Sequence, residues 1–337
     1  MKQMTLSAFG LENLKLTEVA DPKKPGPHQV LVKMHAASLN FRDQLVISGQ
    51  YNPKYPIPLV PCSDGSGEVL EVGESVTQFK VGDPVCATFA PDWIAHKANH
   101  AELRNTLGGP LDGTLRELIL FEETALVPMP KHLTYEEGAT LPCAALTAWS
   151  ALHVFSRLVS GETVLVQGTG GVSLFALQFA KLAGAYVYST SSSEEKLERA
   201  KKLGADFTLN YKEVPDWGKK IREETKQIGV DHVVEVGGAG TLTQSIIACK
   251  PFGNIHLIGI LSGKSGEIQL LPAVMNHIKI QGIVVGGRKA FMEMNQAISV
   301  SGMKPVVDSI FPMEETKEAV QHLKSASHFG KIVIKIS

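Results

Sequence analysis

The fold is decided by the stretch Val164-Leu165-Val166-Gln167-Gly168-Thr169-Gly170-Gly171-Val172-Ser173. An apolar strand runs into a glycine turn, and the apolar residues after the turn predict a helix over Val172–Leu182. A glycine at 168 permits the tight turn, and one at 170 lets the backbone approach a pyrophosphate at the amino end of the helix. Ser173 replaces the third glycine of the pattern, where a small residue is needed for packing of helix on strand. We therefore expect a dinucleotide-binding turn made by Gly168, Thr169, Gly170, Gly171 and Val172.

Strand and helix patterns alternate on the carboxyl side of this turn. Apolar runs predict strands at Thr163–Gln167, Tyr186–Thr190, Val230–Val236 and Ile255–Ile260, and a charged helix is predicted at Glu194–Leu203. Apolar strands separated by helices indicate a parallel sheet covered on both faces. The sequence predicts an α/β chain with a Rossmann doubly wound parallel sheet.

The first 120 residues have a different pattern, typical of an all-β barrel or sandwich. Short strands are predicted at Gln29–Met34 and Gly67–Gly73, with glycine and proline clusters between such runs. After Arg288 the pattern predicts two helices and a last strand at Lys331–Ile336. We expect this last strand to return to the first domain.

Composition and charge exclude several classes of function. The 337 residues suffice for two domains, 44% are hydrophobic, and the net charge is -1 without a long basic run. Nucleic acid and anionic membranes are therefore poor partners. The uncharged stretches Gly138–Ser156 and Thr163–Ala180 are better explained as buried core than as membrane spans. Four scattered cysteines without a C-x-x-C pair, and no secretory signal, predict a cytoplasmic protein with reduced thiols.

The end of the second predicted strand bears on the choice between NAD and NADP. An acidic residue there would bind the ribose 2′-hydroxyl and repel a 2′-phosphate, but this chain has Ser191, Ser192 and Ser193. Lys196 lies one helical turn later, and Tyr211 follows the next strand. The hydroxyls and the ammonium group favour NADP over NAD. Ser192 and Glu195 can also form a capping box with Lys196 solvated, and both interpretations can hold together.

Taken together, these motifs resemble the medium-chain dehydrogenase/reductase superfamily, and within it the zinc-free quinone oxidoreductase and alcohol dehydrogenase-like branch. The segments that carry the resemblance are Gly26–Val32, Asn40–Asp43, Gly49–Tyr51, Gly82–Val85, Leu146–Trp149, the glycine turn, Lys202–Asp206 and Gly330–Val333. The resemblance implies a GroES-like β catalytic domain over 1–144 with 288–337 and a Rossmann domain over 145–287. It also implies that Thr147 binds the cofactor. Together with the apolar runs Ile255–Ile260 and Ile278–Val285, it predicts a homodimer joined at the sheet edges.

The chain departs from the zinc-dependent members of that superfamily. No thiolate occurs over Ala37–Asp43, and Ser63 stands where those enzymes have a histidine ligand. Cys143 alone falls at a ligand position, and one soft ligand cannot hold a catalytic zinc. We therefore expect no zinc. His96 and His100 would make a metal-binding pair if helical, but a polar surface loop is favoured because it explains them without further ligands.

Without zinc, hydrogen-bond donors must polarise the substrate carbonyl. The resemblance to quinone reductases implies that Asn40 and Tyr51 are these donors. The alternatives are that Asn40 caps a turn and Tyr51 shapes a loop. Asp43 is expected to brace the loop, and Arg288 either faces the active-site cleft or pairs with a carboxylate.

The leading hypothesis is an NADPH-dependent reductase of quinones or α,β-unsaturated carbonyls. A zinc-free alcohol dehydrogenase is the first alternative, although it needs a base that the sequence does not show plainly. A dinucleotide-binding protein with little catalysis is the second.

Overall fold

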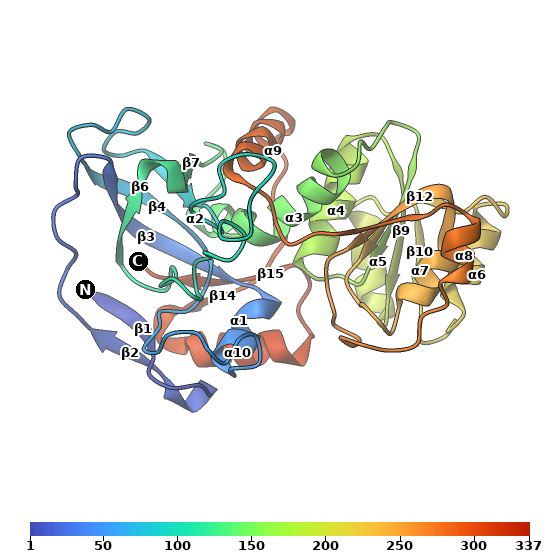
Figure 1. Ribbon diagram of the computed structural model, residues 1–337, viewed down its shortest axis with the longest axis horizontal. Coiled ribbons are helices and arrows are strands. Elements are labelled where there is room, and N and C mark those ends of the chain that lie inside the picture. Colours follow the sequence, from blue (N-terminus) through green and yellow to red (C-terminus); the bar gives the residue numbers. More distant parts are fainter. The chain divides into compact units, whose positions relative to one another are not determined.

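The computed structural model describes residues 1–337, and the chain forms two compact units (Figure 1). The first unit comprises Met1–Leu146 together with Gly286–Ser337, and the second comprises Thr147–Val285. Both ends of the chain therefore belong to one unit. The predicted boundaries, at 144/145 and 287/288, each lie two residues from the observed ones.

The second unit contains a six-stranded sheet in which every neighbouring pair is parallel, in the order β10-β9-β8-β11-β12-β13. Its strands are β8 (Thr163–Gln167), β9 (Tyr186–Ser191), β10 (Phe207–Asn210), β11 (Val230–Glu235), β12 (Cys249–Leu257) and β13 (Lys279–Gly282). The strand order reverses between β8 and β11, and doubly wound sheets bind ligands at the carboxyl ends of the strands beside such a reversal. The predicted Rossmann sheet is confirmed.

Helices connect these strands and cover the sheet. They are α4 (Gly171–Leu182), α5 (Glu194–Lys202), α6 (Trp217–Glu224), α7 (Leu242–Ala248) and α8 (Leu271–Met275), and a short helical run precedes β8 with α3 (Leu146–Trp149) and a π-helical turn at Ser150–Val154. Seven residues of α4 are buried, whereas α5 buries only Leu197 and Ala200. This difference explains why α4 is apolar and α5 is charged.

The first unit is built on a seven-stranded sheet in the order β14-β15-β3-β4-β5-β7, with β6 also paired to β3, and on the separate hairpin β1-β2. The strands are β1 (Lys2–Leu6), β2 (Leu14–Glu18), β3 (Gln29–Leu39), β4 (Asp64–Val72), β5 (Pro84–Ala87), β6 (Leu118–Glu122), β7 (Leu126–Pro128), β14 (Val307–Pro312) and β15 (Lys331–Lys335). The helices are α1 (Phe41–Ile47), α2 (Tyr135–Gly138), α9 (Arg288–Ser301) and α10 (Thr316–Ser325), with 3-10 turns at Leu11–Asn13, Glu123–Ala125 and Met313–Glu315 and a π-helical turn at Leu141–Ala145.

The last strand returns to the first unit, as the sequence predicts. Strand β15, red in Figure 1, runs antiparallel beside the blue strand β3, with Ile332 opposite Leu39. This pairing sets Lys331, the first residue of β15, next to the end of β3. A residue near the carboxyl terminus thereby reaches the segment around Asn40.

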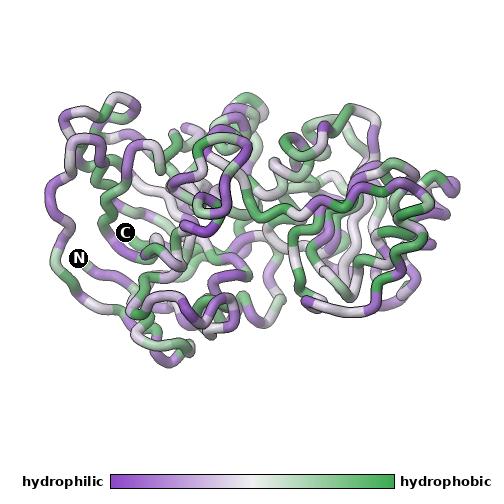
Figure 2. Tube along the Cα trace, viewed as in Figure 1, coloured by the Kyte–Doolittle hydropathy of each residue, from purple (hydrophilic) through white to green (hydrophobic).

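The edge of the Rossmann sheet differs from the prediction. Strand β12 lies inside the sheet and begins at Cys249, earlier than the predicted strand Ile255–Ile260. Strand β13 forms the edge on this side of the sheet, and all four of its residues are exposed. Helix α8 contacts α7 and leaves Leu271, Val274 and Met275 about 70% exposed. Its apolar sequence is one of the green stretches of Figure 2.

No helix combines the length and the apolar character that a bilayer crossing requires. The uncharged stretches noted in the sequence are instead divided between strands and shorter helices. All four cysteines are free thiols.

Candidate functional site

The glycine turn between β8 and α4 contains two glycines that are needed for different reasons. Gly168 has φ +70°, a conformation that other residues adopt only with strain. Gly170, the N-cap of α4, has φ −77° and ψ 177°, and no atom lies within 4 Å of the position that a Cβ would occupy. Neither conformation nor packing therefore requires glycine at 170. The missing side chain keeps open the space at the amino end of α4, where backbone N–H groups and the helix dipole favour a phosphate.

Ser173 and a buried glutamate hold the base of this turn. The Ser173 hydroxyl donates to the carbonyl oxygen of Gln167 at 2.6 Å and thereby ties α4 to the end of β8. The Gln167 side-chain amide donates to Glu235 at 2.8 Å, and Glu235 also accepts hydrogen bonds from the backbone N–H groups of Gly237 and Gly238. Glu235 has no exposed surface. This network fixes the carboxyl ends of β8 and β11 at the strand-order reversal.

Glu235 is a residue of this network that was not among those expected from the sequence. A signal was available, because a carboxylate at the end of the apolar strand Val230–Val236 requires a partner when it is buried.

At the end of β9, the residues predicted to select NADP lie around the start of α5. Ser191 is buried, and its hydroxyl oxygen accepts a hydrogen bond from the Ser193 backbone N–H at 3.4 Å. Tyr211 is 40% exposed, and its N–H donates to the carbonyl oxygen of Ser191. Ser192 and Lys196 are half-buried. These residues thus lie on segments next to the end of β9, and Ser191 is the least exposed of them.

One detail of this segment differs from the prediction, and the acidic residue Glu194 lies near it. The N-cap of α5 is Ser193, whose hydroxyl accepts from the Lys196 N–H, so Ser192 and Glu195 form no capping box. Glu194 accepts a hydrogen bond from the side-chain amide of Asn210 at 2.8 Å and is held toward the next strand. A negative charge therefore remains near the adenosine end of the predicted site.

Thr147 begins the second unit and is buried. Its hydroxyl donates to the carbonyl oxygen of Val284 at 3.2 Å. This contact ties the start of the unit to its end. Whether Thr147 also contacts a cofactor stays a prediction.

In the first unit, four ionisable side chains are buried around the end of β3. Arg42, Asp43, Asp64 and Lys331 are each less than a tenth exposed. Two are cations and two are anions, so the group has no formal net charge. Charged side chains are buried at acceptable cost only when they are paired and hydrogen-bonded, and each of these four makes at least one hydrogen bond inside the unit.

Lys331 connects three parts of this cluster. Its ammonium group donates to the Asn40 side-chain oxygen at 2.5 Å and to the Leu39 carbonyl oxygen at 2.6 Å, and it lies 3.9 Å from Asp64 Oδ2. Asn40 is the N-cap of α1, as the sequence allowed, and its backbone N–H donates to Asp43 at 2.7 Å. The side-chain nitrogen of Asn40 is buried without a hydrogen-bond partner of good geometry.

Asp64 has hydrogen-bond donors on both of its oxygens. The Ser63 hydroxyl donates to Oδ1 at 2.8 Å, and the Cys143 backbone N–H donates to Oδ2 at 3.1 Å. Burial raises the pKa of Asp64 above its ordinary value, although Lys331, the nearby Asn40 amide and these donors oppose the rise. The Asp64 carboxylate therefore accepts hydrogen bonds from Ser63 and Cys143 and lies close to the Lys331 ammonium group.

Asp43 and Arg42 hold the loop that follows β3. Burial raises the pKa of Asp43 to about 6, although the positive charge of Arg42 opposes this rise. The Arg42 guanidinium donates to the carbonyl oxygens of Leu107 and Gly109 and to the hydroxyl of Thr106. Asp43 accepts from the backbone of Asn40, which is the bracing contact expected for it.

Tyr51 lies in the loop after α1 and is 44% exposed. Its ring packs on Arg42, with the guanidinium carbon 5.2 Å from the ring centre, and it lies 6.1 Å from the ring of Tyr55. Arg42 thus links this loop to the segment that contains Asn40. The structure shows the loop-shaping contact and leaves the catalytic role of Tyr51 a prediction.

The residues at the zinc-ligand positions do not fit a catalytic zinc. Ser63 uses its hydroxyl as a donor to Asp64, and a neutral hydroxyl is not among the usual zinc ligands. Burial and the charge of Asp64 raise the pKa of the Cys143 thiol well above its ordinary range, and a single thiol cannot supply the three protein ligands of a catalytic zinc. No group of three or more His, Cys, Asp or Glu side chains has a metal-binding arrangement.

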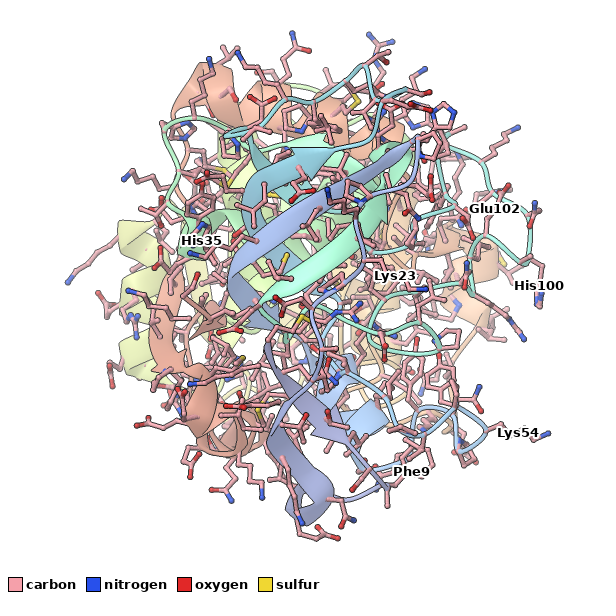
Figure 3. The ribbon with its side chains drawn as sticks, turned by 90° about the vertical axis from the view of Figure 1, so that its left-hand side faces the viewer. Phe9, Lys23, His35, Lys54, His100 and Glu102 are labelled. Atoms are coloured by element: carbon pink, nitrogen blue, oxygen red, sulfur yellow. The ribbon has the colours of Figure 1, made fainter.

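The structure bears on two further pairs of alternatives from the sequence. The segment with His96 and His100 is not helical, and His96 lies 3.4 Å from Glu293. His100 lies on an outer loop (Figure 3), so the pair does not form the helical metal site considered above. Arg288 pairs with no carboxylate: it donates to the carbonyl oxygen of Leu126 and to the side chain of Gln78.

Numbered along the chain, the strands of this parallel sheet follow the order 3-2-1-4-5-6. With a glycine turn at the reversal and an open space at a helix amino end, they define a dinucleotide-binding fold. Two family matches agree with this fold. Residues 26–131 match the alcohol dehydrogenase GroES-like domain, and residues 171–300 match the family described as zinc-binding dehydrogenase.

Relatives with full-length similarity specify the family. The chain is 43% identical to a zinc-type alcohol dehydrogenase-like protein of Schizosaccharomyces pombe, covering 97% of this chain and 96% of the relative. It is 31% identical to an acryloyl-coenzyme A reductase of Metallosphaera sedula, covering 96% of each. A solved NAD-dependent alcohol dehydrogenase is 34% identical, with 100% of both chains covered and a TM-score of 0.92. The chain belongs to the medium-chain dehydrogenase/reductase superfamily and is an oxidoreductase that uses a nicotinamide dinucleotide.

Proposed function

We propose that the chain is a zinc-independent, NADPH-dependent oxidoreductase that reduces quinones or α,β-unsaturated carbonyls by hydride transfer. The observation that carries the proposal is the Asn40 amide. Its oxygen is bound by Lys331, so the buried N–H₂ group faces away from Lys331, near Asp64, and is a donor without a hydrogen-bond partner of good geometry. This donor stands in a segment that lacks the thiolate and imidazole ligands a zinc ion would need.

The chain's residues would act by binding and polarising the carbonyl. The Asn40 N–H₂ group donates to the carbonyl oxygen, and the Tyr51 phenol is the proposed second donor. The bound nicotinamide supplies a hydride, and a solvent proton completes the reduction. Donors aimed at an oxygen that gains negative charge lower the barrier, because that interaction strengthens in the transition state. The name of the acryloyl-coenzyme A reductase relative supports this substrate class, since an acryloyl thioester is an α,β-unsaturated carbonyl.

The proposal of NADPH depends on the segment after β9. No carboxylate occupies position 191, and Ser192, Lys196 and Tyr211 offer two hydroxyl groups and an ammonium group. The carboxylate of Glu194 opposes a 2′-phosphate, although Asn210 holds it. We place NADPH ahead of NADH because a charge-assisted contact from Lys196 is stronger than a neutral one.

The proposal is tested by an absorbance assay of NADPH oxidation with a panel of quinones and enones, together with NADP reduction by a panel of alcohols. We expect turnover with the first panel, zinc well below one atom per chain by elemental analysis, and no loss of activity after chelator treatment. Stoichiometric zinc with chelator-sensitive activity would refute zinc independence. Turnover of alcohols alone would favour the zinc-free alcohol dehydrogenase, and cofactor binding without turnover would favour a binding protein.

We also propose that the chain forms a homodimer through the Rossmann sheet edge. Strand β13 is exposed along its length, and the neighbouring helix α8 exposes Leu271, Val274 and Met275. An exposed edge strand has unpaired backbone groups, and exposed large apolar side chains favour burial, so a second copy that covers both would satisfy both.

A further inference from the structure

The contact with the Lys331 ammonium group determines which way the Asn40 side-chain amide is turned. An asparagine side chain has an acceptor oxygen on one side and an N–H₂ donor on the other. The Lys331 ammonium group can only donate, and it lies 2.5 Å from the Asn40 oxygen. If the amide were turned by 180°, two donors would face each other at this distance. The oxygen must therefore face Lys331, and the N–H₂ group must face away from it.

Lys331 is itself held in place. Only 3% of its surface is exposed, and besides Asn40 its ammonium group binds the Leu39 carbonyl oxygen at 2.6 Å. Asp64 lies 3.9 Å away and supplies an opposite charge. The pairing of β15 with β3 fixes the backbone of Lys331. The Asn40 amide is thus held by a buried cation that has little freedom to move.

A cation on the amide oxygen also changes the strength of the amide as a donor. Hydrogen bonds that involve an ionised group are roughly twice as strong as neutral ones, and linked hydrogen bonds polarise one another at low local dielectric. Electron density drawn toward the oxygen leaves the Asn40 N–H₂ group more positive. Such a donor suits an oxygen that becomes an enolate or hydroquinone oxyanion during reduction.

We infer that Lys331 is a positioning residue for the reaction: it holds the Asn40 amide with its N–H₂ group directed to the substrate carbonyl oxygen and strengthens it as a donor. This inference rests on the proposed function. The competing explanation is that Lys331 serves only as a counter-ion for Asp64, in which case removing the two charges together has no effect on the rate.

Four variants separate these explanations. Asn40→Asp keeps an oxygen toward Lys331 but removes the N–H₂ donor. Lys331→Met combined with Asp64→Asn removes both charges, so that no unpaired buried charge is left to unfold the unit. Lys331→Arg keeps the positive charge and the donors. The control is Lys250→Met, which breaks an ion pair with Asp231 at the amino ends of β11 and β12, opposite the glycine turn.

The rates are measured with NADPH and either 1,4-benzoquinone or cyclohex-2-enone. We expect kcat to fall about tenfold or more in Asn40→Asp and in the Lys331→Met/Asp64→Asn protein, with KM within about threefold of wild type. Adding Asn40→Asp to the double variant should cause little further loss, because both changes act through the same Asn40 donor. Lys331→Arg should restore part of kcat, and Lys250→Met should keep it. Thermal melts verify folding of each variant.

The outcomes for the proposed function and for this inference are distinguishable. If the wild type reduces no acceptor, the proposed function fails and the catalytic role of Lys331 fails with it. If Asn40→Asp loses kcat while the Lys331→Met/Asp64→Asn protein keeps it, the proposed function stands and Lys331 is only a counter-ion. The orientation has its own readout: the Asn40 side-chain ¹⁵N–¹H₂ signals, assigned by their loss in Asn40→Asp, should shift in the double variant. Unchanged signals would overturn the inference.

Discussion

Replacing Gly170 with valine separates cofactor binding from stability. The backbone at 170 has φ −77° and ψ 177°, which valine adopts readily, and no atom lies within 4 Å of the new Cβ position. The free energy of unfolding should therefore fall only by about 1 kcal/mol, the cost of a poorer N-cap residue at the start of α4. The valine side chain would instead fill the space that we assign to the pyrophosphate.

The loss of binding follows from the contacts that the phosphate would lose. A hydrogen bond to a charged group contributes about 1.5–3 kcal/mol, and displacing the pyrophosphate from two backbone N–H groups would cost about 3–6 kcal/mol. Since about 1.4 kcal/mol corresponds to a factor of ten, the Kd for NADPH should rise at least a hundredfold. Titration calorimetry measures the Kd, and urea unfolding measures the stability.

The matched control is Gly282→Val. Gly282 also lacks a positive φ and has open space at its Cβ position, but it lies on the edge strand β13. This variant should bind NADPH as the wild type does at equal protein concentration. Wild-type affinity in Gly170→Val would refute our assignment of the turn, and equal loss in both variants would show that the effect is not local.

The remaining predictions concern the cofactor, the assembly and the effect of pH. NADPH should bind at least about tenfold more tightly than NADH, a difference of about 1.4 kcal/mol. In calorimetric titrations, Ser191→Asp with Lys196→Ala should reverse that order. Equal affinities of the wild type for both cofactors would show that these residues do not recognise the phosphate. Light scattering at micromolar concentration should give the mass of two chains, and Leu271→Glu with Val274→Glu should reduce it to one; a wild-type monomer would count against the proposed dimer. Burial, with a smaller contribution from the charge of His232, lowers the pKa of His256 to about 3, so below about pH 6.5 the unfolded chain binds a proton that the folded chain does not. The free energy of unfolding should therefore decrease as the pH falls from about 6.5 toward 4, and the decrease should be smaller in His256→Gln. Burial raises the pKa of Asp43 to about 6, which has the opposite effect on the free energy of unfolding as the pH falls. The test therefore compares the wild type with His256→Gln, using urea unfolding at each pH. Parallel curves of unfolding free energy against pH would contradict the prediction.

The Rossmann unit could be predicted well because its signals are local. Strand β8 has the predicted bounds, Thr163–Gln167, since an apolar run followed directly by Gly168 determines both its type and its end. Other bounds moved by a few residues. Strand β12 begins at Cys249, because pairing along β11 extends it beyond the apolar residues that the sequence pattern shows.

Contacts distant in sequence could not be predicted in the same way. Asn40 and Lys331 are 291 residues apart, and only the return of β15 to β3 brings them together. The sequence therefore indicated Asn40 as a donor without its partner. The choice between Ser192 and Ser193 as the N-cap of α5 depended on where β9 ends, a boundary that neighbouring serines leave undetermined.

The central claim is that hydride passes from the bound cofactor to an electrophilic carbon of a carbonyl substrate without a metal. The most direct test uses NADPH deuterated at C4 of the nicotinamide, cyclohex-2-enone as the acceptor, and protein treated with a chelator. Mass spectrometry and NMR of the product should show one deuterium at the β-carbon of cyclohexanone. Deuterium at the carbonyl carbon of an alcohol product, or no transfer until zinc is restored, would contradict the account.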